Sequence, residues 1–271
     1  MPHSLKGRSC LTLEEFTGPE IRELIDAAVD LKRLKRLRVF PKALANRNIA
    51  GIFLKPSTRT RTSFVVAASD EGAHLEMFGA DEIRFGQKES VRDIARVMGR
   101  MFDGIAFRGF AHATAEELAA YAGVPVWNGL SDDHHPTQVL ADLMTLQEAF
   151  GELEGLRLAY IGDGRNNVVT SLIVAACKIG LELRVIAPPA LQPAPTSVAA
   201  RLGTCHRRAR VQVMDEPEKG LAGCDAVYGD VWVSMGEPKD VWKERIKLLT
   251  PYQVNAALMK ASGNSQVKFM H

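Results

Sequence analysis

The sequence has little net charge and no long apolar run. Its 34 basic and 32 acidic side chains leave a formal charge of +2, which argues against the strongly basic surface of a general nucleic-acid or membrane-surface binding protein. No apolar stretch approaches the roughly 20 residues that a membrane-spanning helix needs, and the N-terminus lacks a secretory apolar core. We therefore expect a cytoplasmic globular protein of 271 residues with no nucleic-acid and no membrane partner.

Cysteine is also scarce. Cys10, Cys177, Cys205 and Cys224 form no C-x-x-C pair or other spacing typical of a metal site. Because no export signal is visible, we expect these thiols to stay reduced and predict no disulfide framework. The Asp and His residues at 132–135 are candidate metal ligands, but adjacent residues seldom converge on one ion and no second ligand pair lies at helical spacing. We predict no metal site.

Strand-like and helix-like segments alternate along the chain, a pattern typical of parallel sheets covered by helices on both faces. The series restarts near residue 150, after a long amphipathic stretch. We predict an α/β fold of two domains, 1–150 and 151–271, each a parallel sheet flanked by helices and joined by a long inter-domain helix. The candidate strands are 49–54, 74–78, 104–107, 124–127, 156–161, 183–187, 211–214, 226–230 and 267–270, and the candidate helices are 19–36, 64–71, 90–100, 114–121, 137–150 and 167–179.

Hydroxyls and guanidinium groups crowd the turn after the first core strand, which reads Ser57-Thr58-Arg59-Thr60. At the start of a helix, free backbone N–H groups and the helix dipole favour an anion by about 0.3–1 kcal/mol, and arginine adds charge-assisted hydrogen bonds. No glycines flank a Lys-Ser/Thr pair, so the turn is not a Walker loop. It predicts a phosphate site, although a capped helix with exposed arginines would have the same pattern.

Other polar residues also follow predicted strands, where ligands bind in parallel sheets. Arg108 ends one strand, and either faces a cleft or forms a surface ion pair. His135 and Gln138 begin the 137–150 helix and together suit a small polar group. Asp230 and Ser234 follow a strand of the second domain, where the carboxylate would either hold an ammonium group or cap a helix.

Glycines follow another strand, in the sequence Gly162-Asp-Gly-Arg-Asn-Asn167. This pattern invites comparison with dinucleotide-binding folds. The G-x-G-x-x-G spacing is nevertheless absent because Asn167 stands where the third glycine would be, and no acidic residue follows the next strand. The sequence therefore argues against a nicotinamide cofactor.

Taken together, these motifs resemble the aspartate/ornithine carbamoyltransferase family, on its ornithine branch, from about residue 11 to residue 271. The resemblance implies transfer of the carbamoyl group of carbamoyl phosphate to the side-chain amine of ornithine, which gives citrulline and phosphate. It also implies a homotrimer or an assembly of trimers, with no cofactor. Its markers are Ser57-Thr-Arg-Thr60, His135-Pro-Thr-Gln138, Gly162-Asp-Gly-Arg-Asn-Asn167 and Asp230-Val-Trp-Val-Ser-Met235-Gly236.

The resemblance further assigns residues to the two substrates. Arg59, Arg108 and His135 would be catalytic, as donors suited to the charge that develops during transfer. Arg84 stands where many ornithine enzymes have a glutamine and would reach the carbamoyl phosphate of a neighbouring subunit. The residues implied for carbamoyl phosphate are Ser57, Thr58, Arg59, Thr60, Arg84, Arg108, His135 and Gln138, and those implied for ornithine are Asn167, Asp230, Ser234 and Met235.

Two alternatives stay open. The acceptor could be putrescine, an acylated ornithine or aspartate, although aspartate would need extra cations near Asp230 to bind its second carboxylate. The family also continues beyond the match to His271 with a segment that supplies a Cys and an Arg to the site. On this reading the second domain is C-terminally truncated, and the chain would be a carbamoyl-phosphate-binding relative without activity.

Overall fold

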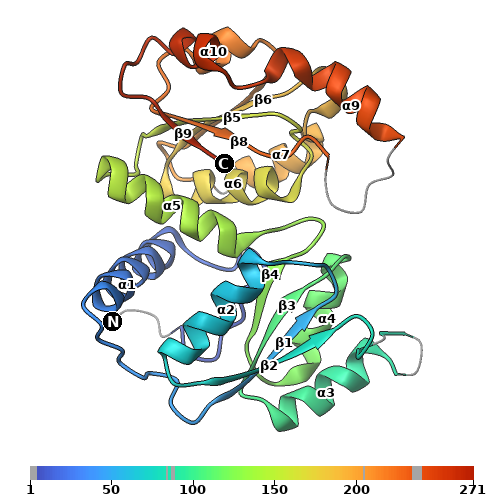
Figure 1. Cartoon of the computed structure of the whole chain (residues 1–271). Coiled ribbons are helices and arrows are strands. Elements are labelled where there is room, and N and C mark those ends of the chain that lie inside the picture. Colours follow the sequence, from blue (N-terminus) through green and yellow to red (C-terminus); the bar gives the residue numbers. More distant parts are fainter. Residues whose placement is uncertain (1–4, 84, 87–88, 204, 234–239) are drawn as a thin grey trace. The chain divides into compact units, whose positions relative to one another are not determined.

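The chain folds into two units, each with its own sheet and core. The computed structural model describes residues 5–83, 85–86, 89–203, 205–233 and 240–271. The units are Met1–Thr145 and Leu146–His271, and each is a parallel sheet with helices on both faces (Figure 1). The predicted fold class is therefore confirmed. Within the described ranges, no helix is long and apolar enough to cross a membrane.

Unit 1 is built on a four-stranded parallel sheet in the order β2-β1-β3-β4. Helices α1 and α2 lie on one face of this sheet, and α3 and α4 lie on the other (Figure 1). All residues of β3 are buried, as expected for a strand covered on both faces. The strands are β1 Asn48–Phe53, β2 His74–Gly79, β3 Gly104–Arg108 and β4 Val126–Leu130, and the helices are α1 Gly18–Arg36, α2 Arg59–Asp70, α3 Val91–Met101, α4 His112–Ala122 and α5 Pro136–Phe150.

The first helix, α1, runs from Gly18 to Arg36, within one residue of the predicted range 19–36. Thr17 and Glu20 make a capping box, in which the Thr17 side chain accepts from the Glu20 N–H and the Glu20 carboxylate accepts from the Thr17 N–H at 2.7 Å. The box satisfies two of the N–H groups that a helix start leaves without intrahelical partners. Pro19 in the first turn adds a preset backbone angle.

Helix α2 begins at Arg59, five residues before the start that we predicted at 64. Thr58 already has helical backbone angles, and its carbonyl accepts a hydrogen bond from the Thr62 N–H at 3.0 Å. Thr58 therefore occupies the N-cap position, and Arg59 and Thr60 lie in the first turn of the helix rather than in a turn ahead of it. The amides of this turn are among those that have no acceptor within the helix.

Unit 2 is built on a five-stranded parallel sheet in the order β7-β6-β5-β8-β9. Helices α6 and α7 lie on one face, and α9 and α10 lie on the other (Figure 1). Ten of the 13 residues of α6 are buried, so this helix forms much of the core. The strands are β5 Arg157–Ile161, β6 Glu182–Ile186, β7 Arg210–Met214, β8 Ala226–Gly229 and β9 Lys268–Met270, and the helices are α6 Asn167–Ile179, α7 Pro195–Leu202, α8 Pro217–Leu221, α9 Val241–Leu249 and α10 Ala256–Ala261, with short 3-10 turns at Pro189–Leu191 and Thr250–Tyr252.

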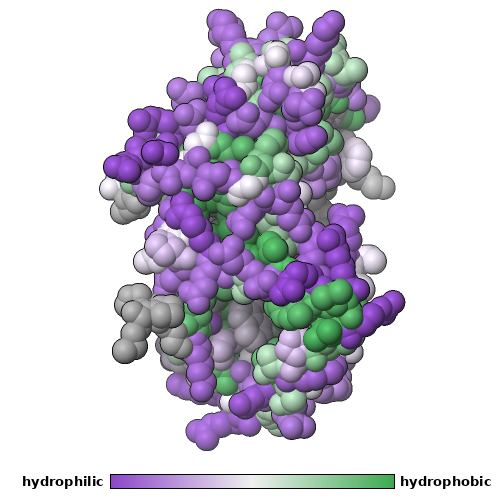
Figure 2. Space-filling view, turned by 90° about the vertical axis from the view of Figure 1, so that its left-hand side faces the viewer, coloured by the Kyte–Doolittle hydropathy of each residue, from purple (hydrophilic) through white to green (hydrophobic). Residues whose placement is uncertain are grey.

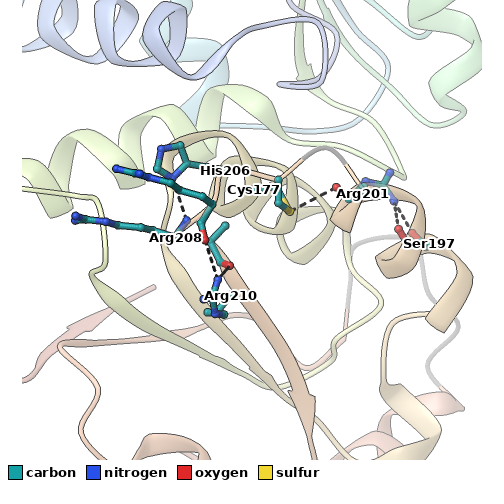
Figure 3. Close-up of a disulfide and its surroundings, with 9 residues drawn as sticks. Cys177, Ser197, Arg201, His206, Arg208 and Arg210 are labelled. Carbon is teal, nitrogen blue, oxygen red and sulfur yellow. Dashed lines mark hydrogen bonds between the residues drawn. A yellow bond between two sulfur atoms is a disulfide. The ribbon is translucent and has the colours of Figure 1, made fainter.

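A disulfide joins Cys177 in α6 to Cys205, which follows α7 (Figure 3). The prediction that all four cysteines stay reduced is therefore wrong for this pair, whereas Cys10 and Cys224 are free. The two half-cystines are 28 residues apart in sequence, but their Cα atoms are 4.1 Å apart. The His206 N–H, which donates to the Cys177 carbonyl at 2.6 Å, holds the returning chain against the end of α6. Such a contact depends on tertiary folding, so cysteine spacing alone did not reveal it.

Candidate active site

The predicted phosphate-binding residues of unit 1 lie where neighbouring strands end. The 57–60 segment follows β1, Arg108 is the last residue of β3, and His135 follows β4 just before α5. In the sheet, Phe53 of β1 is paired with Arg108 of β3, and Arg108 is paired with Leu130 of β4. The carboxyl ends of the three strands therefore meet at one edge, where α/β sheets bind their ligands.

Arg108 is the most deeply buried cation at this edge, with 5% of its surface exposed. Its Nη1 donates to the Thr60 hydroxyl at 3.3 Å, while its Nε is buried without a hydrogen-bond partner in the described part of the chain. Burial, followed by the charge of Arg59, lowers the pKa of Arg108. The guanidinium stays charged because its normal pKa is above 12. Arg59 and Arg108 therefore place two positive charges near each other, and a bound anion would reduce their repulsion.

His135 lies beside this pair and is also buried. Burial, and then the charge of Arg108, lowers the pKa of His135 to about 3. The imidazole is therefore neutral near pH 7, where it can donate one hydrogen bond but carries no charge. The charge of Arg59 thus acts on Arg108, and the charge of Arg108 acts on His135, so Arg108 lies near both of the other predicted catalytic residues.

Gln138 lies in the first turn of α5, near His135. Its side-chain nitrogen donates to the Asp142 carboxylate, one turn further along the helix, at 2.9 Å. Thr137, between these two residues, has its hydroxyl 3.5 Å from the His135 Nδ1. Local hydrogen bonds therefore hold the polar groups at the start of α5.

Arg59 and Thr58 are exposed and border a groove of about 810 Å³ on unit 1. The groove lies between α1 and α2, and Leu31, Phe40 and Val66 form part of its apolar wall. Figure 2 shows apolar residues among polar ones on the face of unit 1 turned toward the viewer. The start of α2 is therefore open to molecules that approach from solvent.

The first histidine of the His134-His135 pair has a different environment from the second. The ring of His134 lies against that of His112, with 4.7 Å between ring centroids, and Ser131 lies 2.8 Å from the His112 ring. Across the described ranges, no group of three or more His, Cys, Asp or Glu residues has the arrangement of a metal site. His134 therefore packs within the loop that supports His135.

The polar residues of unit 2 also lie at the ends of neighbouring strands. Asp230 follows β8, and Asn166 and Asn167 follow β5, which pairs with β8. Asn166, which the sequence analysis did not single out, donates from Nδ2 to the Asp230 carboxylate at 3.1 Å. Its position just before a helix is typical of an N-cap, and this signal could have identified it. Burial raises the pKa of Asp230.

The glycines after β5 are needed for the shape of the turn. Gly162 has φ +146°, which side chains rarely adopt. A Cβ on Gly164 would lie only 2.9 Å from the Leu191 carbonyl oxygen, and the Gly164 N–H donates to that oxygen at 2.8 Å. The tight turn places Asn166 at the start of α6.

Three predicted site residues, Arg84, Ser234 and Met235, lie outside the described residues. The remaining ones form two groups, one in each unit. A family model described as the carbamoyl-P binding domain of aspartate/ornithine carbamoyltransferase matches residues 8–148, and its Asp/Orn binding domain matches residues 154–271. The chain belongs to the aspartate/ornithine carbamoyltransferase family.

Several members of this carbamoyltransferase family resemble the chain over nearly its whole length. A protein from Pseudomonas syringae pv. actinidiae, named ornithine carbamoyltransferase 2, phaseolotoxin-insensitive, is 55% identical over 99% of this chain and 82% of its own length. The catabolic ornithine carbamoyltransferase of Rhizobium meliloti (strain 1021) is 48% identical over 100% of this chain and 82% of its own length. The structure of ornithine carbamoyltransferase from Pyrococcus furiosus superposes with a TM-score of 0.92 at 37% identity, covering 99% of this chain and 85% of that one.

Proposed function

We propose that this chain catalyses carbamoyl transfer from carbamoyl phosphate to the side-chain amine of ornithine, giving citrulline and phosphate. One observation carries the proposal: the chain is 55% identical, over 99% of its length, to a protein named as an ornithine carbamoyltransferase. The clustering of Arg59, Arg108 and His135 in the carbamoyl-P binding domain supports it from the geometry.

Carbamoyl phosphate binds unit 1 in this proposal. The phosphate lies at the start of α2 and accepts hydrogen bonds from Ser57, Thr58, Arg59 and Thr60, with the Arg108 guanidinium beside it. The open N–H groups of a helix start favour such an anion. The positive charges of Arg59 and Arg108 add to the attraction. The buried Arg108 Nε can donate a further hydrogen bond to the phosphate. His135 and Gln138 hold the carbamoyl group. Arg84 contributes from a neighbouring subunit.

The reaction joins the neutral side-chain amine of ornithine to the carbamoyl carbon. The carbonyl oxygen gains negative charge during attack, the C–O bond to phosphate breaks, and the amine loses a proton as phosphate leaves. His135 donates a hydrogen bond to the carbonyl oxygen as a neutral imidazole, because its pKa of about 3 keeps it unprotonated near pH 7. Arg59 and Arg108 stabilise the leaving phosphate. A preorganised donor of this kind contributes about 3–4 kcal/mol to lowering the barrier.

Ornithine binds unit 2 in this proposal, through Asn167, Asp230, Ser234 and Met235. The Asp230 carboxylate pairs with an ammonium group, which favours an acceptor with amino groups over one with a second carboxylate. A second carboxylate next to Asp230 would meet like charge, which costs affinity. This electrostatic argument supports ornithine over aspartate.

We also propose that the protein works in the cytoplasm. In this proposal it forms a homotrimer or an assembly of trimers, because Arg84 acts across a subunit boundary. Light scattering after gel filtration tests the assembly. A mass of three times 29.7 kDa, or a multiple of it, is expected, and a monomer would contradict the role given to Arg84.

The decisive experiment is an assay of citrulline from carbamoyl phosphate and ornithine. Arg59→Ala should reduce kcat/KM by about 100- to 1,000-fold, as expected for loss of one such donor. Arg61→Ala is the matched control: it removes another exposed arginine of α2, and residues two apart on a helix face different directions. Undiminished turnover by Arg59→Ala would refute the phosphate site, and no citrulline from the unmodified chain would refute the function.

A further inference from the structure

The proposed function gives no role to Tyr160, although this residue has an unusual position. It is the last but one residue of β5 and is fully buried in the core of unit 2. Its hydroxyl donates to the Asp163 carbonyl at 3.1 Å and accepts from the Asn166 side-chain nitrogen at 2.6 Å. A buried phenol with both contacts satisfied is held in a single orientation.

Asn166 is held equally firmly, and in a known direction. Its Oδ1 caps α6 by accepting from the Val169 N–H at 2.9 Å. The cap directs the amide nitrogen to the opposite side, where it donates both to the Tyr160 hydroxyl and to Asp230 Oδ2 at 3.1 Å. The second carboxylate oxygen of Asp230 accepts from the Val231 N–H at 2.8 Å. Each oxygen of Asp230 therefore has one donor that fixes it.

The turn between Tyr160 and Asn166 is itself braced. The Asp163 carboxylate accepts from the backbone N–H and side chain of Arg165 and from the side chain of Arg245. The Tyr160 ring stacks on that of Tyr228 in β8, with 6.0 Å between centroids. The contacts from Tyr160 to Asp230 thus begin at a tyrosine ring that is buried in the core of unit 2.

We propose that Tyr160 and Asn166 are positioning residues that hold the Asp230 carboxylate in the orientation that receives the ammonium group of the acceptor. The proposal rests on the proposed function for the identity of that acceptor. Neither residue needs to touch the substrate. Tyr160 acts only through Asn166, and Asn166 acts through Asp230.

The hydrogen bond from Asn166 also favours the ionised form of the Asp230 carboxylate. Burial raises the pKa of Asp230, so the site itself disfavours the ionised carboxylate that an ammonium group requires. Hydrogen bonds donated to a carboxylate favour its charged form. Asn166 supplies such a bond, and Tyr160 keeps Asn166 turned toward Asp230. Preorganised groups of this type lower the cost of binding because they need not be reordered.

Tyr160→Phe tests the proposal with the smallest change, since it removes one oxygen and keeps the stacked ring. We expect the KM for ornithine to rise about three- to tenfold, the effect of one lost hydrogen bond, with the KM for carbamoyl phosphate unchanged. Asn166→Ser keeps an acceptor for the helix cap but removes the side-chain amide N–H groups that donate to Tyr160 and Asp230, and should raise the ornithine KM further. Tyr252→Phe is the matched control, because the hydroxyl of Tyr252 also donates to a backbone carbonyl, that of Asp215 at 2.7 Å.

The outcomes separate this inference from the proposed function. An unchanged ornithine KM in Tyr160→Phe, or an equal rise in Tyr252→Phe, would overturn the positioning role. Citrulline formation by the unmodified protein would still uphold the proposed function in either case. If the unmodified chain makes no citrulline, calorimetric titration with ornithine in the presence of phosphate decides: weaker binding in Tyr160→Phe than in Tyr252→Phe supports the positioning role. A chain that neither turns over nor binds ornithine would overturn both.

Discussion

The two units provide very different surroundings for their candidate site residues. In unit 1, Arg108 is buried next to another cation, its Nε lacks a partner in the described part of the chain, and its hydrogen bond goes to a neutral hydroxyl. In unit 2, Asp230 is held by Asn166 and the Val231 N–H, and Asn166 is held in turn by Tyr160. Among the residues that the structure describes, Arg108 thus has no anionic partner, whereas both oxygens of the Asp230 carboxylate accept hydrogen bonds.

The difference shows how the site residues of each unit affect the free energy of folding. A buried charge without a counter-charge destabilises the folded state, and an anionic ligand would relieve that cost on binding. A site whose groups bind each other costs the fold little and presents its carboxylate already oriented. Substitutions should therefore separate activity from stability in unit 1 but change both together in unit 2.

The largest expected effect comes from Arg108→Met, which keeps an unbranched side chain of similar reach and removes the charge. We expect kcat/KM for carbamoyl phosphate to fall by about 100- to 1,000-fold. The free energy of unfolding should stay the same or rise, because the buried cation next to Arg59 disappears. Assays of citrulline formation and urea unfolding on the same preparation test both halves. A large loss of stability would show that Arg108 has a compensating partner and would break the contrast between the units.

The second effect concerns the covalent tie of unit 2. Cys205→Ser should lower the free energy of unfolding by about 3–4 kcal/mol under non-reducing conditions, from the entropy of a loop of this length in the unfolded chain, whose cysteines are 28 residues apart. Reducing agent should abolish the difference from the unmodified protein. Cys10→Ser is the control, since Cys10 is a free thiol of unit 1.

Thiol titration in denaturant gives an independent check on the same tie. Two reactive thiols per unmodified chain are expected, those of Cys10 and Cys224, because the other two of the four cysteines are joined. Four reactive thiols would contradict the disulfide, and the stability difference should then vanish as well.

Sequence reasoning succeeded where a local pattern determines the outcome. The apolar runs of both sheets and the long α6 follow from residues close in sequence. Arg108 acts electrostatically on His135 and is acted on by Arg59, and all three residues lie at or after the ends of strands of one parallel sheet. Parallel pairing brings the ends of neighbouring strands to one edge, and the structure supplies the strand order that the sequence analysis did not predict.

Sequence reasoning failed where the decisive contact is tertiary. Helices α7 to α10 are between five and nine residues long, too short to form alone, and they depend on packing against the sheet. The Cys177–Cys205 disulfide depends on the return of the chain after α7. Asn166 was missed because its contact with Asp230 joins residues 64 positions apart. The N-cap pattern identifies the position of such a residue but not its partner.

The smallest expected effect is on the pH dependence of the free energy of unfolding, and it comes from His135 in unit 1. The folded state holds the pKa of His135 at about 3, against 6.5 for a free histidine, so the unfolded chain binds more protons between these values. Stability from this group is therefore constant above about pH 6.5 and falls as the pH drops toward 3. His135→Gln should remove about 2 kcal/mol of the loss between pH 7 and pH 5, as measured by urea unfolding at both values. As a control, His74→Gln, at an exposed position of β2, should show the same change in free energy of unfolding between pH 7 and pH 5 as the unmodified protein. A slope in His135→Gln equal to that of the unmodified protein would mean that the imidazole is protonated in the folded state, and the neutral donor assigned to the carbamoyl oxygen would have to be abandoned.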